Sequence, residues 1–357
     1  MCDASPSTDL PPIYVIGYPG SIGGACTELW HTLKLWRQFG QEVHLVPTWS
    51  ADRHWRSKCD EIGCHTHDLG AYDWDTLRAV PGLAGATIIS FCNENFLLYM
   101  RAFRKLHCRV IWVNCMNWLF PEEKRHYRRH GPLDAYVFQS RYQQRTLMRE
   151  LARYDVSQHR CHRIAGAFDV TDYPFCPRPH TSGDDFYVGR LSRPDLDKYS
   201  SNTWPIYSAI PYSRRRARVL GWSPEVETKL GRPPAWAEVM SPGKQDARSF
   251  VESLHCLLHV TGGSRENWPR CALEAMALGV PIVAEDDFGW PEMIEHGTSG
   301  LLGRCDQELS YYAARLAYDE PYRLEMALAA RRRLSEVLAR PRTLWRRWRR
   351  LFEQLAD

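Results

Sequence analysis

The feature that most constrains this chain is the alternation of short apolar runs with longer helical patterns. Residues 13–16 form a β-rich run, and glycines follow at positions 17, 20, 23 and 24. A helical pattern then covers residues 25–39, and a second apolar run covers residues 42–46. Strand, glycine turn, helix and strand in this order form a βαβ unit, which predicts a parallel sheet.

The alternation continues in both halves of the chain. Further strands are predicted at residues 87–91, 110–113, 135–138, 164–166, 186–188, 217–220, 237–240, 257–260 and 281–284. Helices are predicted at residues 246–254 and 270–278. The stretch 173–185 carries three prolines and a glycine without periodicity, as is typical of an interdomain linker. The sequence therefore predicts an α/β fold of two doubly wound domains, residues 1–175 and 176–340.

Length and composition agree with two folded domains. The chain has 357 residues, of which 44% are hydrophobic and 25% charged. It holds no apolar span of about 18 residues, and residues 1–12 lack the pattern of a secretory signal. We therefore expect a cytoplasmic protein whose twelve cysteines are reduced thiols. The net charge of +4 does not indicate a nucleic-acid partner, although arginines are dense at 214–218, 331–333 and 342–350.

The strongest candidate for chemistry is the segment 266–281, which follows an apolar strand and a glycine turn. Pro269 suits the first turn of a helix, and Gly279 suits its end. Glu266 then lies in the loop before the helix, and Glu274 lies about five residues inside it. The start of a helix offers unpaired N–H donors and partial positive charge to a diphosphate. Two carboxylates beside such a seat can accept hydrogen bonds from sugar hydroxyls.

This segment resembles the signature of retaining GT-B glycosyltransferases, particularly glycosyltransferase family 4. The resemblance rests on Glu266, Glu274 and the following Ala-Met-Ala-Leu-Gly-Val-Pro, and it continues through residues 289–294 and 296–300. It implies that Glu266 binds the transferred sugar and Glu274 the nucleotide ribose. It further places backbone donors of Asn267 and Trp268 near the sugar or phosphate. Pro269 and Arg270 complete the predicted donor-binding segment.

The resemblance extends to a second motif, Gly189-Arg190-Leu191, with Lys198 eight residues after the arginine. It implies that Arg190 and Lys198 lie on the diphosphate. Fixed cations stabilise the charge of a departing diphosphate without a metal ion. Arg193 is a rival for Lys198 in the same loop. With Glu266, Arg190 and Lys198 are the predicted catalytic residues, and Gly189 joins the binding residues.

A third motif, Gly23-Gly24, opens the first predicted helix and resembles the first loop of the family, which touches phosphate and acceptor. A tight strand-to-helix connection explains these glycines equally well. The glycine spacing fits neither the dinucleotide fingerprint nor a P-loop. No cofactor is predicted beyond a nucleoside-diphosphate sugar as donor substrate.

The chain departs from the family on the acceptor side. Many members carry a histidine after the strand at 110–113, where this chain has Asn-Cys-Met-Asn. His126 and His130 come later and are expected on a solvated helix face. A retaining transfer needs no protein base if the leaving phosphate oxygen takes the acceptor proton. Residues Cys59, Cys64, His65 and His67 are zinc ligand types but crowd one strand, so no metal site is predicted.

The C-terminal segment 341–357 is a basic amphipathic helix, with six apolar residues on one side and arginines on the other. The resemblance implies that this helix crosses back to pack on the first domain. The alternative is contact with a membrane surface or a nucleic acid.

Together these features predict a GT-B fold with two Rossmann-like domains facing a central cleft, the first for acceptor and the second for donor. The predicted activity is metal-independent transfer of a hexose from a UDP- or GDP-linked donor, with retention of configuration. The acceptor, whether a small molecule, glycan, lipid-linked group or nucleic acid, is not identified. The alternatives are a nucleotide-sugar epimerase or hydrolase on the same scaffold, or a nucleic-acid or membrane-surface binding protein that uses its arginine runs.

Overall fold

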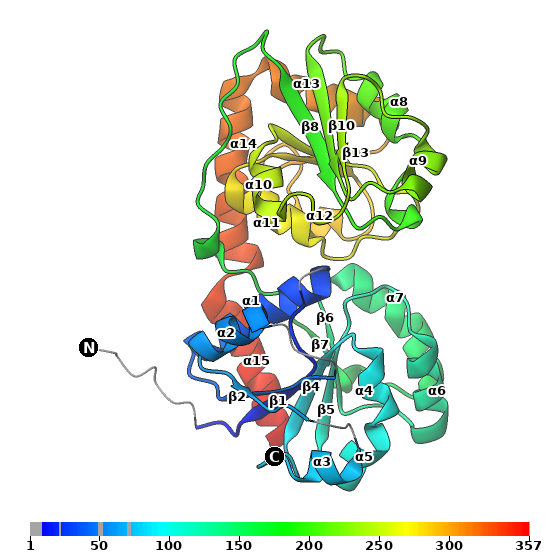
Figure 1. The fold of residues 1–357 in the computed structure, drawn as a ribbon, viewed down its shortest axis with the longest axis vertical. Helices are drawn as coiled ribbons and strands as arrows, with labels where there is room; N and C mark the ends of the chain where they lie inside the picture. Colours follow the sequence, from blue (N-terminus) through cyan, green and yellow to red (C-terminus); the bar gives the residue numbers. More distant parts are fainter. Residues whose placement is uncertain (1–8, 21–22, 49–52, 70–72, 357) are drawn as a thin grey trace, which may run out of the picture. The chain divides into compact units, whose positions relative to one another are not determined.

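The computed structural model describes residues 9–20, 23–48, 53–69 and 73–356 (Figure 1). The chain divides into two compact units. The first comprises Met1–Asp169 and Pro341–Asp357, and the second comprises Val170–Arg340. Each unit is a parallel sheet with helices on both faces (Figure 1).

The first unit has a seven-stranded sheet in the order β3-β2-β1-β4-β5-β6-β7. Its strands are β1 (Ile13–Ile16), β2 (Val43–Val46), β3 (His65–Thr66), β4 (Thr87–Phe91), β5 (Arg109–Val113), β6 (Ala135–Phe138) and β7 (Cys161–Arg163). Every residue of β1 and β6 is buried. Strands buried on both faces read as continuous apolar runs, which is why the sequence pattern located them.

The helices of the first unit follow the strands in the usual βαβ manner. They are α1 (Gly24–Gln38), α2 (Arg53–Glu61), α3 (Trp74–Arg78), α4 (Glu94–Leu98), α5 (Met100–Lys105), α6 (Pro121–His130), α7 (Arg141–Leu151), the 3-10 turns η1 (Ala152–Tyr154) and η2 (Gln158–Arg160), and α15 (Pro341–Ala356).

The second unit has a six-stranded parallel sheet in the order β10-β9-β8-β11-β12-β13. Its strands are β8 (Phe186–Leu191), β9 (Arg215–Leu220), β10 (Ala237–Met240), β11 (Cys256–His259), β12 (Ile282–Glu285) and β13 (Leu301–Gly303). The strand order reverses between β8 and β11, which pair directly. In sheets of this kind ligands bind outside the carboxyl ends of the strands at such a reversal.

The helical segments of the second unit lie on both faces of its sheet (Figure 1). They are η3 (Val170–Asp172), η4 (Leu196–Lys198), α8 (Thr203–Ser208), α9 (Pro224–Leu230), α10 (Ala247–Glu252), α11 (Arg270–Leu278), α12 (Trp290–Met293), α13 (Asp306–Tyr318), α14 (Glu320–Arg333) and the π-helical turn η5 (Leu334–Leu338).

The C-terminal helix α15 returns to the first unit and contacts α1 and β4. The ring of Trp348 meets that of Trp36 edge-on at 5.0 Å between centroids, and Trp345 stacks on Phe39 at 5.6 Å. The apolar side of α15 is therefore occupied by packing, and the two Rossmann-like sheets with a returning helix confirm the predicted fold class. In the part of the chain that the structure describes, no helix has the length and apolarity needed to span a membrane.

Two local predictions are wrong. The strand predicted at 164–166 is not present: the strand here is β7, which ends at Arg163. Ile164 adds one further backbone hydrogen bond, from its N–H to Phe138 O. His126 is not solvated: it is buried in α6, and burial, with the nearby charges of Arg104 and His130, lowers its pKa to about 4. Its place beside α5 gives it a packing role, and His130 is the exposed member of the pair.

The stretch 173–185, predicted to link the domains, packs on the second unit. Cys176 N–H donates to Leu278 O at 3.1 Å, and Arg331 donates to Tyr173 O at 2.8 Å. The change of unit precedes this stretch, between Asp169 and Val170.

Candidate active site

Two loops meet at the strand reversal of the second unit. The loop after β8 and the loop after β11 are joined where Gly262 and Ser264 donate backbone N–H bonds to Asp197 O, at 3.0 and 2.8 Å. A Cβ added to Gly262 would lie 2.0 Å from Tyr199 O, so the close approach requires glycine. The glycine turn seen in the sequence is therefore the contact between these loops.

A third loop, after β12, fixes the backbone of Glu266. Gly289 N–H donates to Glu266 O at 2.9 Å, and a Cβ on Gly289 would lie 1.8 Å from Asn267 O. Residues 289–294, which carried part of the sequence resemblance, thus support the loop that presents Glu266.

The structure brings Glu266 and Lys198 together from these loops. Lys198 Nζ lies 2.7 Å from Glu266 Oε1, and the two side chains are 21% and 11% exposed. Arg193, the rival cation, instead pairs with Asp195 at 3.0 Å. Lys198 is therefore the cation at the predicted sugar-binding carboxylate, where it remains partly accessible to a ligand.

Arg190 is placed differently from Lys198. Its side chain is fully buried, and its guanidinium donates to the carbonyls of Val260 and Lys198, both at 2.5 Å. It also lies over the Tyr199 ring at 4.3 Å. In this conformation Arg190 joins the loops after β8 and β11 and supplies a fixed positive charge beneath them, so its predicted direct contact with a diphosphate stays a prediction.

Gly189 precedes this arginine in β8. A Cβ there would lie 2.5 Å from Leu254 and 2.6 Å from Arg218 O, so packing explains this glycine.

Helix α11 begins at Arg270, one residue after Pro269, and ends at Gly279, whose φ of 87° lies in the left-handed region. Glu274 is the fifth residue of α11 and is 6% exposed. Burial raises the pKa of Glu274 to about 7, although Arg270 acts in the opposite direction. Its carboxylate makes no hydrogen bond within the described residues, so this buried acceptor is available to hydroxyl donors of a ligand.

Further buried polar atoms near Glu266 lack hydrogen-bond partners among the described residues. They are Trp268 Nε1, Trp290 Nε1, His259 Nδ1 and Arg190 Nε. Native proteins hold only a few such atoms per 100 residues, because each costs about 1–3 kcal/mol. Similar atoms occur elsewhere in both units, so these four are polar groups that a ligand at this site could complete.

Two of these residues, His259 and Trp290, were not found by sequence reasoning. His259 ends β11, and its Nε2 lies 3.8 Å from Glu266 Oε1. Its ring centroid lies 5.0 Å from that of Trp290. Trp290 lies in the segment 289–294 that carried part of the resemblance but was given no role there, and a histidine within an apolar strand usually signals packing. Glu285 was missed too: its Oε2 accepts from Thr261 N and Oγ1 at 3.0 and 2.8 Å.

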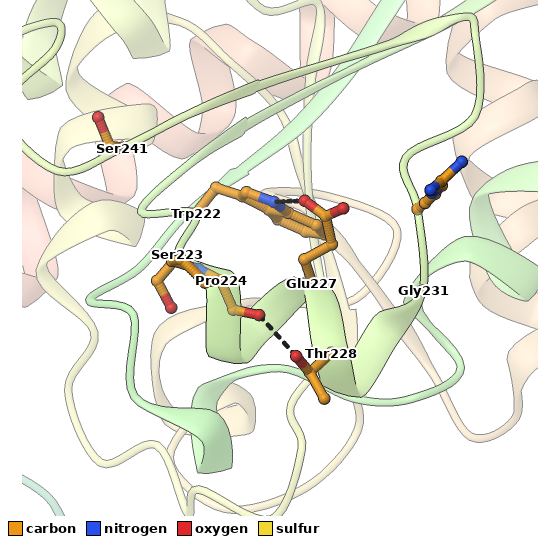
Figure 2. A pocket seen from close by; sticks show the side chains of 8 residues that line it. Trp222, Ser223, Pro224, Glu227, Thr228, Gly231 and Ser241 are labelled. Carbon is orange, nitrogen blue, oxygen red and sulfur yellow. Dashed lines mark hydrogen bonds between the residues drawn. The ribbon is translucent and has the colours of Figure 1, made fainter.

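A pocket of about 630 Å³ opens beside these loops, at the carboxyl ends of β9 and β10 (Figure 2). Its lining residues are Trp222, Ser223, Pro224, Glu227, Thr228, Gly231, Arg232 and Ser241. Within this lining the Trp222 indole donates to Glu227 at 3.2 Å. Lys229, on the helix that forms the pocket wall, donates to Leu196 O at 2.7 Å. The pocket therefore borders the loop that carries Lys198.

The remaining candidates lie in the first unit. Gly24 begins α1 and Gly23 precedes it with a φ of 107°, while positions 21–22 of the predicted loop lie outside the described residues. Their predicted contact with phosphate and acceptor stays a prediction. Cys59 and Cys64 are buried, and burial raises their thiol pKa values to about 11 and 12. The described part of the chain contains no group of three or more acidic, histidine or cysteine side chains suited to a metal ion.

Comparison with known proteins relates the segment that carries Glu266 and Glu274 to a known family. The family model "Glycosyl transferases group 1" matches residues 239–333, which include Glu266, Glu274 and α11. The match covers about a quarter of the chain, within the second unit. The predicted resemblance to glycosyltransferases of family 4 is thereby confirmed for this segment.

Similar proteins extend the comparison. The amylovoran biosynthesis glycosyltransferase AmsK of Erwinia amylovora is 35% identical over 98 residues, which span 23% of this chain and 24% of that protein. Anabaena HepE, solved with UDP-glucose, has a TM-score of 0.71 at 17% identity, covering 96% of this chain and 99% of that one.

Two other solved structures show the same fold over nearly the whole chain. S. aureus TarM, in a complex that includes UDP, has a TM-score of 0.71 at 10% identity and covers 96% of this chain and 99% of that one. Sucrose-phosphate synthase of Thermosynechococcus elongatus has a TM-score of 0.71 at 14% identity, covering 96% and 98%.

Proposed function

We propose that this chain is a glycosyltransferase that moves a sugar from a nucleoside-diphosphate sugar to an acceptor, with retention of anomeric configuration. The observation that carries the proposal is the pair of Lys198 and Glu266 at the strand reversal, 2.7 Å apart. Glu266 lies in the loop that leads into α11, which begins at Arg270. A cation, a carboxylate and a helix N-terminus together suit a ligand that carries both a diphosphate and sugar hydroxyls.

In this proposal the donor's diphosphate lies at the N-terminus of α11 and draws the Lys198 ammonium. Glu266 accepts hydrogen bonds from sugar hydroxyls through Oε2, which makes no bond to the described residues. Backbone N–H groups of Asn267 and Trp268 bind the sugar or phosphate. Glu274, a buried carboxylate, accepts from the ribose hydroxyls. The fixed charge of Arg190 supports the diphosphate from beneath the loops.

We assign the nucleotide base to the pocket at Trp222 (Figure 2). This pocket borders the Lys198 loop on the β9 side of β8, whereas the loop that carries Glu266 follows β11 on the other side of β8. Trp222, although largely buried, contributes to the pocket wall, and Glu227 and Ser241 offer polar contacts to base edges. UDP-glucose is the first donor to test, because HepE was solved with that compound.

The chemistry in this proposal is electrostatic. As the bond between sugar and diphosphate breaks, charge develops on the leaving phosphate, and Lys198 with the α11 N–H groups stabilises it. The leaving phosphate oxygen takes the acceptor's proton, so no protein base is required. The first unit serves as the acceptor domain. An anionic acceptor or membrane surface would meet the exposed arginines of α15, whose apolar side is already packed.

The proposal is tested by thermal-shift measurements with UDP-, GDP- and ADP-glucose, followed by turnover of the donor that binds. A ligand that binds the folded state raises the melting temperature. We expect one donor class to stabilise the wild-type chain, and Glu266→Ala to abolish sugar transfer. Normal turnover in Glu266→Ala, or stabilisation by none of the donors, would refute the assignment. Donor hydrolysis or sugar interconversion without any acceptor would favour a hydrolase or epimerase instead.

A further inference from the structure

The carboxylate of Glu266 is held from two sides in this structure. Lys198 Nζ contacts Oε1 at 2.7 Å, and His259 Nε2 approaches the same oxygen at 3.8 Å. Lys198 comes from the loop after β8 and is 21% exposed, whereas the His259 side chain ends β11 and is 1% exposed. One partner of Glu266 is thus a long, partly exposed side chain, and the other is a ring buried in the core.

The surroundings of His259 define its protonation. Burial, together with the positive charges of Arg190 and Lys198, keeps its pKa well below 6.5, so the ring is neutral. Its Nδ1 has no partner among the described residues. A neutral imidazole carries one N–H, and the carboxylate beside Nε2 favours the proton on that nitrogen. His259 therefore presents an N–H donor toward Glu266 Oε1 at a distance just beyond hydrogen-bonding range.

Donor binding changes which of the two residues, Lys198 or His259, contacts Glu266 Oε1. In the proposed function Lys198 turns to the diphosphate, and Glu266 then loses its closest partner while it is being covered by the donor. A buried carboxylate without a partner is costly, and its orientation toward the sugar would be lost. A shift of less than about 1 Å brings Oε1 into hydrogen-bonding range of His259 Nε2.

We propose that His259 is a positioning residue for Glu266, which takes over Oε1 when Lys198 turns to the donor's diphosphate. Oε2 then remains directed to the sugar hydroxyls. This inference rests on the proposed function and deepens it. It also explains why a polar residue stands at the end of β11, where the neighbouring strand residues Leu257 and Leu258 are apolar and fully buried.

The test compares the affinities of UDP and UDP-glucose by isothermal titration calorimetry. Glu266 touches only the sugar, so loss of its positioning must weaken UDP-glucose and leave UDP unchanged. We expect His259→Phe, which keeps a ring but removes the N–H, to lower the preference for UDP-glucose over UDP about tenfold. His259→Gln, whose amide also carries a donor, should restore most of that preference. A merely structural role would weaken both ligands together.

Glu274→Gln is the matched control, because the ribose is common to both ligands and their ratio should not change. An unchanged ratio in His259→Phe would overturn the proposal. If His259→Phe also weakens UDP binding, a double-mutant cycle with Glu266→Gln decides between the two roles. Losses of UDP-glucose binding energy that simply add in the double variant overturn the proposal, and a double variant that loses less than the sum supports it.

Failure of the proposed function gives a different result from failure of this inference alone. If the wild-type chain binds neither UDP and UDP-glucose nor the corresponding GDP and ADP pairs, the donor site is refuted and this inference with it. If one pair binds the wild-type chain, the same variants are measured with that pair.

Discussion

Replacement of Glu274 by glutamine separates the stability of the second unit from its proposed function. Burial raises the pKa of this carboxyl from 4.5 to about 7. A tenfold change in an equilibrium is worth about 1.4 kcal/mol, so ionising Glu274 in the folded protein costs about 3 kcal/mol above pH 7. Because the pKa is higher in the folded than in the unfolded chain, the free energy of unfolding of the unliganded protein falls by about this amount as the pH rises from about 5 through 7.

Glutamine has a similar shape and carries no charge, so it removes this pH-dependent cost. We expect Glu274→Gln to be more stable than the wild-type chain by up to about 3 kcal/mol at pH 8, and to differ little at pH 5. The measurement is urea denaturation of both proteins, without ligand, between pH 5 and 8.5. The donor affinity of Glu274→Gln should be lower than that of the wild-type chain, since glutamine is a weaker acceptor for ribose hydroxyls than a carboxylate.

An exposed glutamate of α14, Glu325, supplies the control: Glu325→Gln should show no such trend with pH. A stability difference between Glu274→Gln and the wild-type chain that stays constant from pH 5 to 8.5 would refute the argument from burial. Equal donor affinity of the two proteins at pH 8 would refute the assignment of Glu274 to the ribose.

Three further predictions follow from single contacts. Lys198→Met should weaken UDP and UDP-glucose alike, by tenfold or more, because both carry the diphosphate; calorimetric titration checks it, and unchanged affinity for UDP would remove Lys198 from the diphosphate. Gly262→Ala should abolish donor binding, because its Cβ would lie 2.0 Å from Tyr199 O and would push apart the loops after β8 and β11. A thermal-shift titration with the donor tests this, and retained binding would mean that the site does not depend on the contact between these loops. Trp348→Ala should destabilise the first unit by about 3–5 kcal/mol in urea denaturation, because it removes a buried indole packed on Trp36; a loss below about 1 kcal/mol would contradict the packing of α15.

Much of the fold could be predicted because parallel strands covered on both faces are continuous apolar runs. The runs at 13–16, 87–91 and 135–138 coincide with β1, β4 and β6, and the partly exposed edge strand β10 coincides with the run at 237–240. Strands β3 and β13 were not predicted. They have two and three residues, and β3 consists of two polar side chains, so neither stands out from a loop.

The candidate site divides in the same way. Glu266 and Glu274 could be found because their spacing around one helix is local in the sequence. The contact of Glu266 with Lys198 joins residues 68 positions apart, and only the order of the strands brings them together. The burial of Arg190 and the place of His259 beneath Glu266 depend on side-chain packing, which no spacing reveals.

The central claim is that the pair of Lys198 and Glu266 binds the sugar and diphosphate of a nucleotide-sugar donor. The most direct measurement is transfer of a radiolabelled sugar from the donor that binds, compared between the wild-type chain, Glu266→Gln and Lys198→Met in a membrane-containing cell extract that supplies acceptors. The account predicts label transfer by the wild-type chain and a loss of at least a hundredfold in each variant. Transfer at the wild-type rate by either variant would contradict it.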